Sequence, residues 1–228
     1  MKKKLLSILA TGLFLIGVTG IANAITISVS QGGNILGNIK SYSGNLSGAE
    51  NYDWYNAKNH VHNGPTAVEK QGQIFFYEGS DGLSFNTIFS SVGDNTISKV
   101  EWDITIAGST SDPSVLVTDD QCELTESSTD NVFEGRWKYV QYLGDGGTIG
   151  EISGNTWSVT IDPVFYDNIT SLKAYGTSNS ISLNLDLNKK IVFTIANSSA
   201  PVPEPATMLL FGTGLAGLVG IKLSKKKK

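Results

Sequence analysis

The chain contains few of the residues on which many enzymes and small secreted domains depend. Its single cysteine, Cys122, cannot form a disulfide within the chain, and only two histidines are present among 228 residues. No G-x-S-x-G segment and no glycine-rich phosphate loop occurs. The sequence therefore offers no disulfide framework, no serine nucleophile elbow and no nucleotide-binding motif.

Basic residues are scarce in the middle of the chain. Eight of the 17 Lys and Arg residues lie at its ends, at Lys2, Lys3, Lys4, Lys222, Lys225, Lys226, Lys227 and Lys228. Residues 25–203 contain nine basic and 20 acidic side chains, a net charge of −11. Nucleic acid is excluded as a partner, because binding it requires a basic surface that displaces counterions from phosphates. Hard cations such as Ca²⁺ remain compatible with this charge.

The first 24 residues have the three parts of a secretory signal peptide. Lys2–Lys4 supply a positive start, residues 5–21 carry no charge, and Ala22-Asn23-Ala24 forms an A-x-A cleavage site. Signal peptidase accepts only small side chains at Ala22 and Ala24. We expect cleavage after Ala24 and export of the rest of the chain.

A second apolar segment lies near the other end. Residues 206–221 carry no charge and would span about 24 Å as a helix, against about 30 Å of hydrocarbon. Lys222 can extend its side chain to the interface, so we expect a marginal transmembrane helix over residues 206–223. The basic tail, residues 224–228 with Lys225 to Lys228, would stay in the cytoplasm while the body lies on the far side.

Three small residues recur within this apolar segment at a spacing of four. Gly212, Ala216 and Gly220 would form a smooth strip along one helix face, against which another helix can pack closely. Glycine and alanine are also common in membrane helices without such a role. The strip is a candidate surface for helix packing in the membrane.

A linker with closely spaced prolines, residues 198–205, precedes the apolar segment. Pro203 and Pro205 favour extended backbone in Val202-Pro203-Glu204-Pro205, the form that processing enzymes grip. This motif, the apolar helix and the basic tail together resemble the PEP-CTERM sorting domain of Gram-negative bacteria. The resemblance covers residues 201–228 and implies recognition and removal of the tail by an exosortase, a membrane-embedded cysteine enzyme. It also implies an association with exopolysaccharide and the extracellular matrix.

Alternation of apolar and polar residues dominates residues 25–197. Val100, Trp102, Ile104 and Ile106 alternate with polar residues, and the same period appears in 156–161 and 181–187. Further strands are expected at 25–29, 73–77, 85–91, 114–118, 136–143 and 191–196, separated by turns at 79–82, 93–95, 108–112 and 144–147. This pattern predicts an all-β domain, an antiparallel β-sandwich of jelly-roll type.

The most unusual stretch of this body is Asn51 to His62. Tyr52, Trp54 and Tyr55 are candidates for stacking on sugar rings, although core packing is the commoner fate of aromatic side chains. His60 and His62 would share a strand face, as metal ligands can, but no further Cys or His lies at a suitable spacing. We therefore predict no metal site there.

Two acidic segments are candidate chemical sites. Glu101-Trp102-Asp103 resembles the E-x-D-x-x-E strand of a jelly-roll family of glycoside hydrolases, but the third carboxylate is missing. The segment from Asp145 to Glu151 is acidic and rich in glycine, and Ca²⁺ is the one cofactor it suggests, although it lacks D-x-D spacing.

These patterns predict a secreted surface or extracellular-matrix protein that is not an enzyme. Its expected partners are signal peptidase, an exosortase, the membrane through residues 206–223, and extracellular polysaccharide. A structural or adhesive role in the envelope or exopolysaccharide matrix is the main hypothesis. A carbohydrate-binding module is the alternative, and a glycan-active hydrolase is a less favoured one.

Overall fold

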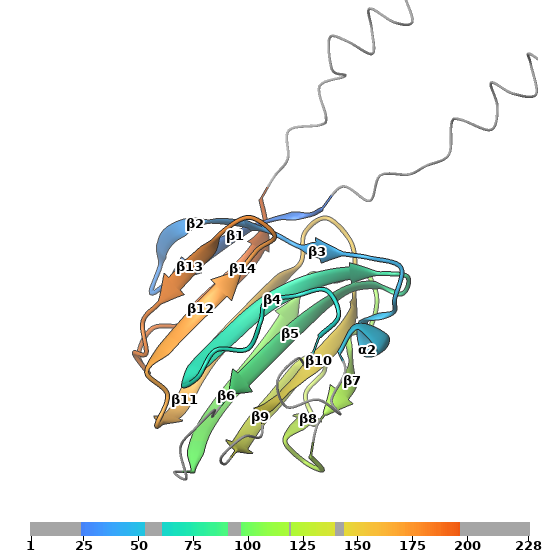
Figure 1. The fold of residues 1–228 in the computed structure, drawn as a ribbon. Helices are drawn as coiled ribbons and strands as arrows, with labels where there is room; N and C mark the ends of the chain where they lie inside the picture. Colours follow the sequence, from blue (N-terminus) through green and yellow to red (C-terminus); the bar gives the residue numbers. More distant parts are fainter. Residues whose placement is uncertain (1–23, 53–60, 91–96, 119, 140–143, 197–228) are drawn as a thin grey trace, which may run out of the picture. The chain divides into compact units, whose positions relative to one another are not determined.

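The computed structural model describes residues 24–52, 61–90, 97–118, 120–139 and 144–196, and these residues are nearly all β (Figure 1). They form fourteen strands and one short helix. The bounds are β1 Thr26–Gln31, β2 Asn34–Lys40, β3 Tyr42–Ser43, α2 Gly48–Asn51, β4 Gln71–Gly79, β5 Gly82–Ser90, β6 Ser98–Ala107, β7 Ser114–Thr118, β8 Leu124–Glu126, β9 Val132–Tyr139, β10 Gly144–Ile152, β11 Ser158–Asp167, β12 Ser171–Tyr175, β13 Ser180–Leu183 and β14 Ile191–Ile195.

The strands form two sheets that enclose one hydrophobic core. The first sheet has the order β2-β1-β14-β11-β6-β9-β8, and the second has the order β13-β12-β4-β5-β10-β7 with β3 paired to β4. Alternate residues of both sheets are fully buried in the shared core, among them Trp102 and Phe193 of the first and Phe76 and Phe89 of the second. Phe76 and Phe193 meet edge to face at 5.3 Å, which joins the sheets through aromatic contacts.

Most strand pairs are antiparallel, as expected, but β4 is an exception. Both β12 and β3 run parallel to it, with Leu172 opposite Gly72 and Tyr42 opposite Tyr77. The prediction of antiparallel sheets therefore holds for every strand pair of the first sheet and for the other pairs of the second. A parallel pair needs a long connection between its strands, and alternation within a strand carries no information about the direction of its neighbour.

The first and last strands of the body lie side by side. Residue Ile27 of β1 is opposite Ile195 of β14, and β14 is flanked on its other side by β11. The start of β1 and the end of β14 therefore lie at one end of the first sheet, which we call the terminal end (Figure 1). At the other end of β1 and β14, Gln31 faces Ile191, which is opposite Ile161 of β11; β11 continues for six more residues, to Asp167 opposite Lys99 of β6.

Several sequence predictions changed in the structure. Residues 144–147 were expected to be a turn, but they open β10, a strand inside the second sheet between β5 and β7. The predicted strand at 181–187 ends at Leu183. The hairpin turn at 79–82 was confirmed, since Gly79 pairs with Gly82. Strands β2, β3, β8 and β12 were not predicted.

Among the residues that the structure describes, no helix is long and apolar enough to cross a membrane. The predicted signal peptide, residues 1–24, lies outside the described residues except for Ala24. The predicted linker from residue 198, the membrane helix and the basic tail all lie outside them as well.

Candidate functional site

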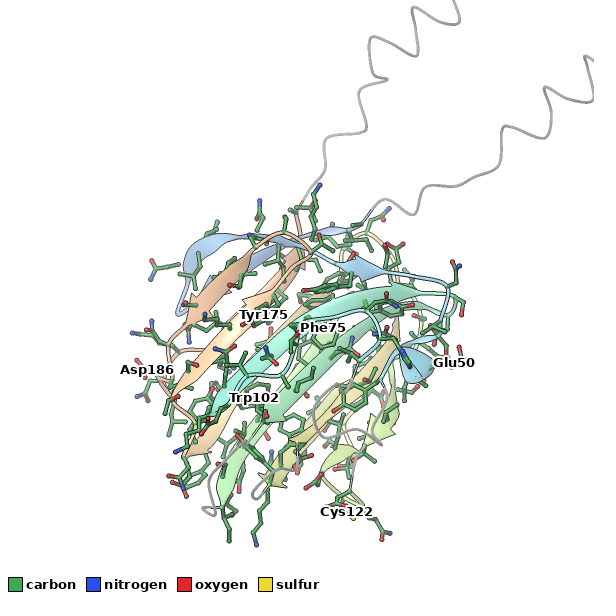
Figure 2. All side chains as sticks on the ribbon, in the orientation of Figure 1. Glu50, Phe75, Trp102, Cys122, Tyr175 and Asp186 are labelled. Carbon is green, nitrogen blue, oxygen red and sulfur yellow. The ribbon has the colours of Figure 1, made fainter. Side chains whose placement is uncertain are left out.

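The segment between β2 and β4 covers the outer face of the second sheet. It forms a small second core in which Tyr52 packs with Tyr77, Ile88 and Phe75 of the sheet. Figure 2 labels Phe75 on β4. A capping box begins α2 here, because the Ser47 hydroxyl accepts from the Glu50 N–H and the Glu50 carboxylate accepts from the Ser47 N–H. These contacts fix the position of α2 and of Tyr52, which directly follows it.

Tyr52 is a core residue rather than an exposed sugar platform. Its side chain is only 1% exposed, and its hydroxyl donates to the carbonyl of Thr87 on β5 over 3.4 Å. The ring has no open face on which a pyranose could stack, so the prediction of sugar binding by Tyr52 was wrong. Trp54 and Tyr55, the other two aromatic candidates, lie outside the described residues.

Asn51 and Asn63 join the two ends of the segment from which Trp54 and Tyr55 come. The Asn51 side-chain oxygen accepts from the Asn63 backbone N–H at 2.8 Å, and the Asn51 amide donates to the Asn63 carbonyl at 3.2 Å. The Asn51 side chain is fully buried. His62 is exposed, whereas His60 lies outside the described residues. This pairing holds Asn51 and Asn63 together, which the sequence did not indicate.

Buried polar side chains line the outer face of the second sheet beside this pair. The Gln73 amide donates to the carbonyl of Thr66 over 2.9 Å, which fastens the returning segment to β4. On the neighbouring strands the Thr148 hydroxyl donates to the Asn86 side-chain oxygen over 2.9 Å. All three of these sheet residues are fully buried, so their hydrogen bonds satisfy polar groups within the covered face.

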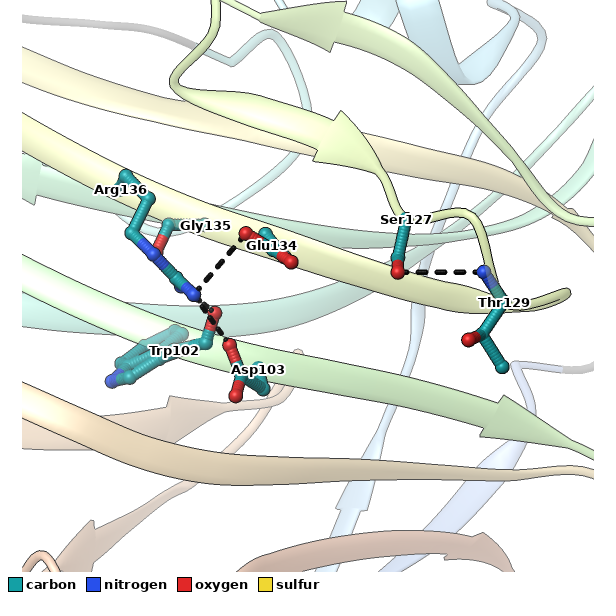
Figure 3. Close-up of polar contacts among 7 residues, drawn as sticks. All are labelled: Trp102, Asp103, Ser127, Thr129, Glu134, Gly135 and Arg136. Carbon is teal, nitrogen blue, oxygen red and sulfur yellow. Dashed lines mark hydrogen bonds and ion pairs between the residues drawn. The ribbon is translucent and has the colours of Figure 1, made fainter.

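The two carboxylates of the hydrolase-like segment lie on the outer face of the first sheet. Arg136 donates to the Asp103 carboxylate at 2.7 Å and to the carbonyl of Trp102 at 2.7 Å (Figure 3). Glu101 pairs instead with Lys99 at 3.6 Å. Each carboxylate therefore has its own cationic partner, while Trp102 between them points into the core.

Asp103 belongs to a row of three carboxylates on adjacent strands. It lies opposite Glu134 of β9 on one side and Asp162 of β11 on the other. Like charges in such positions repel each other, but Arg136 bridges Glu134 and Asp103, and Lys190 lies 2.7 Å from Asp162. No group of three or more His, Cys, Asp or Glu side chains in the described part of the chain is arranged to hold a metal ion.

The segment suggested for Ca²⁺ is strand rather than loop. Asp145 is buried, and its carboxylate accepts backbone N–H groups from Gly146 at 2.7 Å and Lys138 at 3.2 Å. Glu151 lies six positions further along β10, which corresponds to roughly 20 Å of extended strand. The two carboxylates therefore do not converge.

The residues predicted to direct sorting lie outside the described residues. They are Ala22 of the cleavage site, Val202, Pro203, Glu204 and Pro205 of the motif, Gly212, Ala216 and Gly220 of the helix strip, and Lys222, Lys225, Lys226, Lys227 and Lys228 of the tail. Ala24 is described and directly precedes the body. These predictions are therefore carried by sequence alone.

Comparison with known proteins supports the sorting motif predicted in the tail. The PEP-CTERM protein-sorting motif matches residues 201–226. No curated protein and no solved structure matches the chain. The match implies an exported protein whose tail is processed by an exosortase, and it covers none of the β body.

Proposed function

We propose that this chain is a non-catalytic surface or matrix protein with a structural or adhesive role in the cell envelope or its exopolysaccharide. The match of residues 201–226 to the PEP-CTERM sorting motif is the observation that carries this proposal. Signal peptidase would release the body after Ala24, and an exosortase would remove the tail. The body, a jelly-roll-like sandwich, would then remain at the surface or in the matrix.

The chemistry of the body supports a role without catalysis. A glycoside hydrolase needs one carboxyl group to protonate the leaving oxygen and a second to act as base or nucleophile. Asp103 is instead held by Arg136, and Glu101 is paired with Lys99. Residues of this kind stabilise an exposed sheet face, which suits a protein that must persist outside the cell.

Replacement of the motif tests the sorting step. In a host that contains an exosortase, Pro203→Ala, Glu204→Ala and Pro205→Ala together should leave the full-length chain in the inner membrane. Pro201→Ala, which changes a proline outside the four-residue motif, is the matched control and should be processed normally. Intact mass and cell fractionation report the outcome. Release of the triple variant at the rate of the wild type would overturn the proposal.

Carbohydrate binding is a second candidate function, through Trp54 and Tyr55. The observation that favours it is the pairing of Asn51 with Asn63, which lie on either side of them in the sequence and are joined by hydrogen bonds. Fixing the flanking residues in advance lowers the conformational entropy that the chain loses when it binds a ligand. Such a module would attach the exported protein to its polysaccharide.

A further inference from the structure

Ile25 would be the first residue of the chain after signal peptidase has acted, and the body binds its backbone on both sides. The Ile25 N–H donates to the Ser41 hydroxyl oxygen over 2.9 Å, and the Ile25 carbonyl accepts from the Ser41 N–H over 2.9 Å. Ser41 is fully buried, and the Ile25 side chain packs against the main core. The nitrogen of the predicted cleavage site, the bond from Ala24 to Ile25, is therefore part of the folded body.

Ser41 lies where the chain passes from the first sheet to the second. Lys40 ends β2 in the first sheet, and Tyr42 begins β3, which pairs with β4 of the second sheet. In a regular antiparallel pair a backbone carbonyl would accept the Ile25 N–H. Here the acceptor is a side-chain oxygen instead. Alanine at position 41 would offer no such acceptor.

The contacts that hold Ile25 in place come from residues that remain after cleavage. β1 begins one residue later and pairs with β2 on one side and with β14 on the other. The Thr26 carbonyl also accepts from the Ala196 N–H over 2.9 Å. Because these strands fix the backbone that follows Ile25, removal of the signal peptide leaves its nitrogen facing Ser41.

We propose that Ser41 binds the free α-amino group that cleavage after Ala24 creates. Hydrolysis adds the oxygen of a water molecule to the Ala24 carbonyl carbon, and both protons of that water end on the Ile25 nitrogen. The products at neutral pH are a carboxylate on Ala24 and an ammonium group on Ile25. One N–H of this ammonium group donates to Ser41, and the hydrogen bond is stronger than that of the amide because the donor is charged.

The neutral acceptor suits an ammonium group that stays partly in water. The ion pairs of the described residues involve other cations, namely Lys99, Arg136, Lys189 and Lys190. Ile25 is only partly buried, so the remaining N–H bonds of its ammonium group donate to water. This arrangement avoids the free-energy cost of a fully buried charge without a counterion.

The contact has a consequence for persistence outside the cell, and this consequence rests on the proposed export of the protein. Chain ends that are not bound to the body are the preferred sites of proteolysis. A chain that begins at Ile25 has no residue ahead of the one that Ser41 binds, and its first side chain packs on the core. An aminopeptidase therefore finds no free extended end to bind.

A double-mutant cycle on the exported, processed protein tests the contact. One change is Ser41→Ala, and the other inserts Gly-Ser between Ala24 and Ile25, which moves the free amine two residues away and leaves an amide N–H at Ile25. Ser41→Ala should lower the folding equilibrium constant about thirtyfold in the mature chain but only about fivefold in the extended chain, because a charged donor forms the stronger bond. Ser28→Ala, at a half-buried position of β1, is the matched control and should act equally in both chains.

Labelling of the amine gives a second measurement that does not depend on the stability of Ser41→Ala. In the wild type, the Ile25 amine should react with an acylating reagent at least about tenfold more slowly in the folded protein than in denaturant, since the hydrogen bond must open first. The amine of the extended chain should react at similar rates in both conditions.

The outcomes separate this inference from the proposed function. Equal effects of Ser41→Ala in the mature and extended chains would overturn the contact, as would a processed chain that begins at a residue other than Ile25. An Ile25 amine that reacts equally fast in the folded and the denatured protein would overturn it too. Intact mass of the same samples reports whether the tail was removed, so a failure of sorting is recognised independently.

Discussion

The backbone N–H of Ala196 donates a 2.9 Å hydrogen bond to the carbonyl of Thr26. The last residue after β14 is thereby joined to the first residue of β1. Because β14 lies between β1 and β11, β1 and β2 have no partner in the rest of the first sheet until residues 191–195 are in place. Folding of the body therefore depends on the stretch that directly precedes the sorting region.

Two truncated chains test this dependence. A chain that ends after Ala196 should fold to a protease-resistant body, whereas one that ends after Lys190 should not. The shorter chain loses the fully buried Ile191 and Phe193 together with two strand pairings, a cost of at least about 5 kcal/mol. Limited proteolysis and near-ultraviolet circular dichroism measure the difference. Equal protection of both chains would contradict the central role of β14.

Gly146 on β10 is expected to tolerate no side chain. Its φ is +156°, and a Cβ there would lie within 2.0 Å of the Thr87 carbonyl oxygen and 2.5 Å of the Tyr52 hydroxyl. Gly146→Ala should lower the free energy of unfolding by about 3 kcal/mol, because backbone atoms cannot yield as flexible side chains do. Chemical denaturation provides the measurement.

Gly33 supplies the control for that experiment. Its φ is +83°, but no atom lies within 4 Å of a Cβ built there. Gly33→Ala should therefore cost only about 1 kcal/mol, from backbone strain alone. If both substitutions lower the free energy of unfolding equally, the close approach of Tyr52 and β5 is not the reason that position 146 requires glycine.

Alternation in the sequence located the strands whose side chains divide between core and surface. In β6, Val100, Trp102, Ile104 and Ile106 are buried, as predicted. β10 was not predicted because four of its nine residues are glycines. Glycines have no side chain to alternate, and they otherwise indicate turns. The parallel contact of β12 with β4 is non-local, and no pattern within either strand encodes it.

The candidate site was less predictable for a related reason. Tyr52 and Trp54 have the same residue class and nearly the same position, so composition could not say which one the fold buries. The burial of Tyr52 depends on Gly146, 94 positions further along the chain, whose missing side chain leaves room for the hydroxyl. The Asn51–Asn63 pairing likewise was not predicted, because no motif in the sequence indicates that these two residues lie together.

Alkaline pH should destabilise the body through Tyr139 and Tyr166. Burial against the core raises the pKa of both hydroxyl groups above the ordinary value of 10.0. The folded state therefore holds these protons more tightly than the unfolded chain does. Their contribution to stability is fully present below about pH 10, the unfolded pKa, and it is lost as the pH rises above that value.

Denaturant titrations at pH 8 and pH 11 measure this loss. Tyr139→Phe with Tyr166→Phe should be as stable as the wild type at pH 8, within about 1 kcal/mol, and should lose less stability on transfer to pH 11. A double variant with the pH dependence of the wild type would show that other groups control alkaline unfolding.

Carbohydrate binding makes a prediction that separates Trp54 and Tyr55 from the core. Trp54→Ala and Tyr55→Ala should each reduce affinity for a glycan by about tenfold, since stacking on an aromatic ring is worth on the order of 1 kcal/mol or more. Tyr52→Phe is the internal control, because it removes only the buried hydroxyl bonded to Thr87. That variant should bind glycan normally while unfolding at a slightly lower temperature. Calorimetry with the host's own exopolysaccharide provides the measurement. Absence of binding at millimolar saccharide, or an equal loss in all three variants, would remove Trp54 and Tyr55 as a sugar site and leave the sandwich a purely structural or adhesive body.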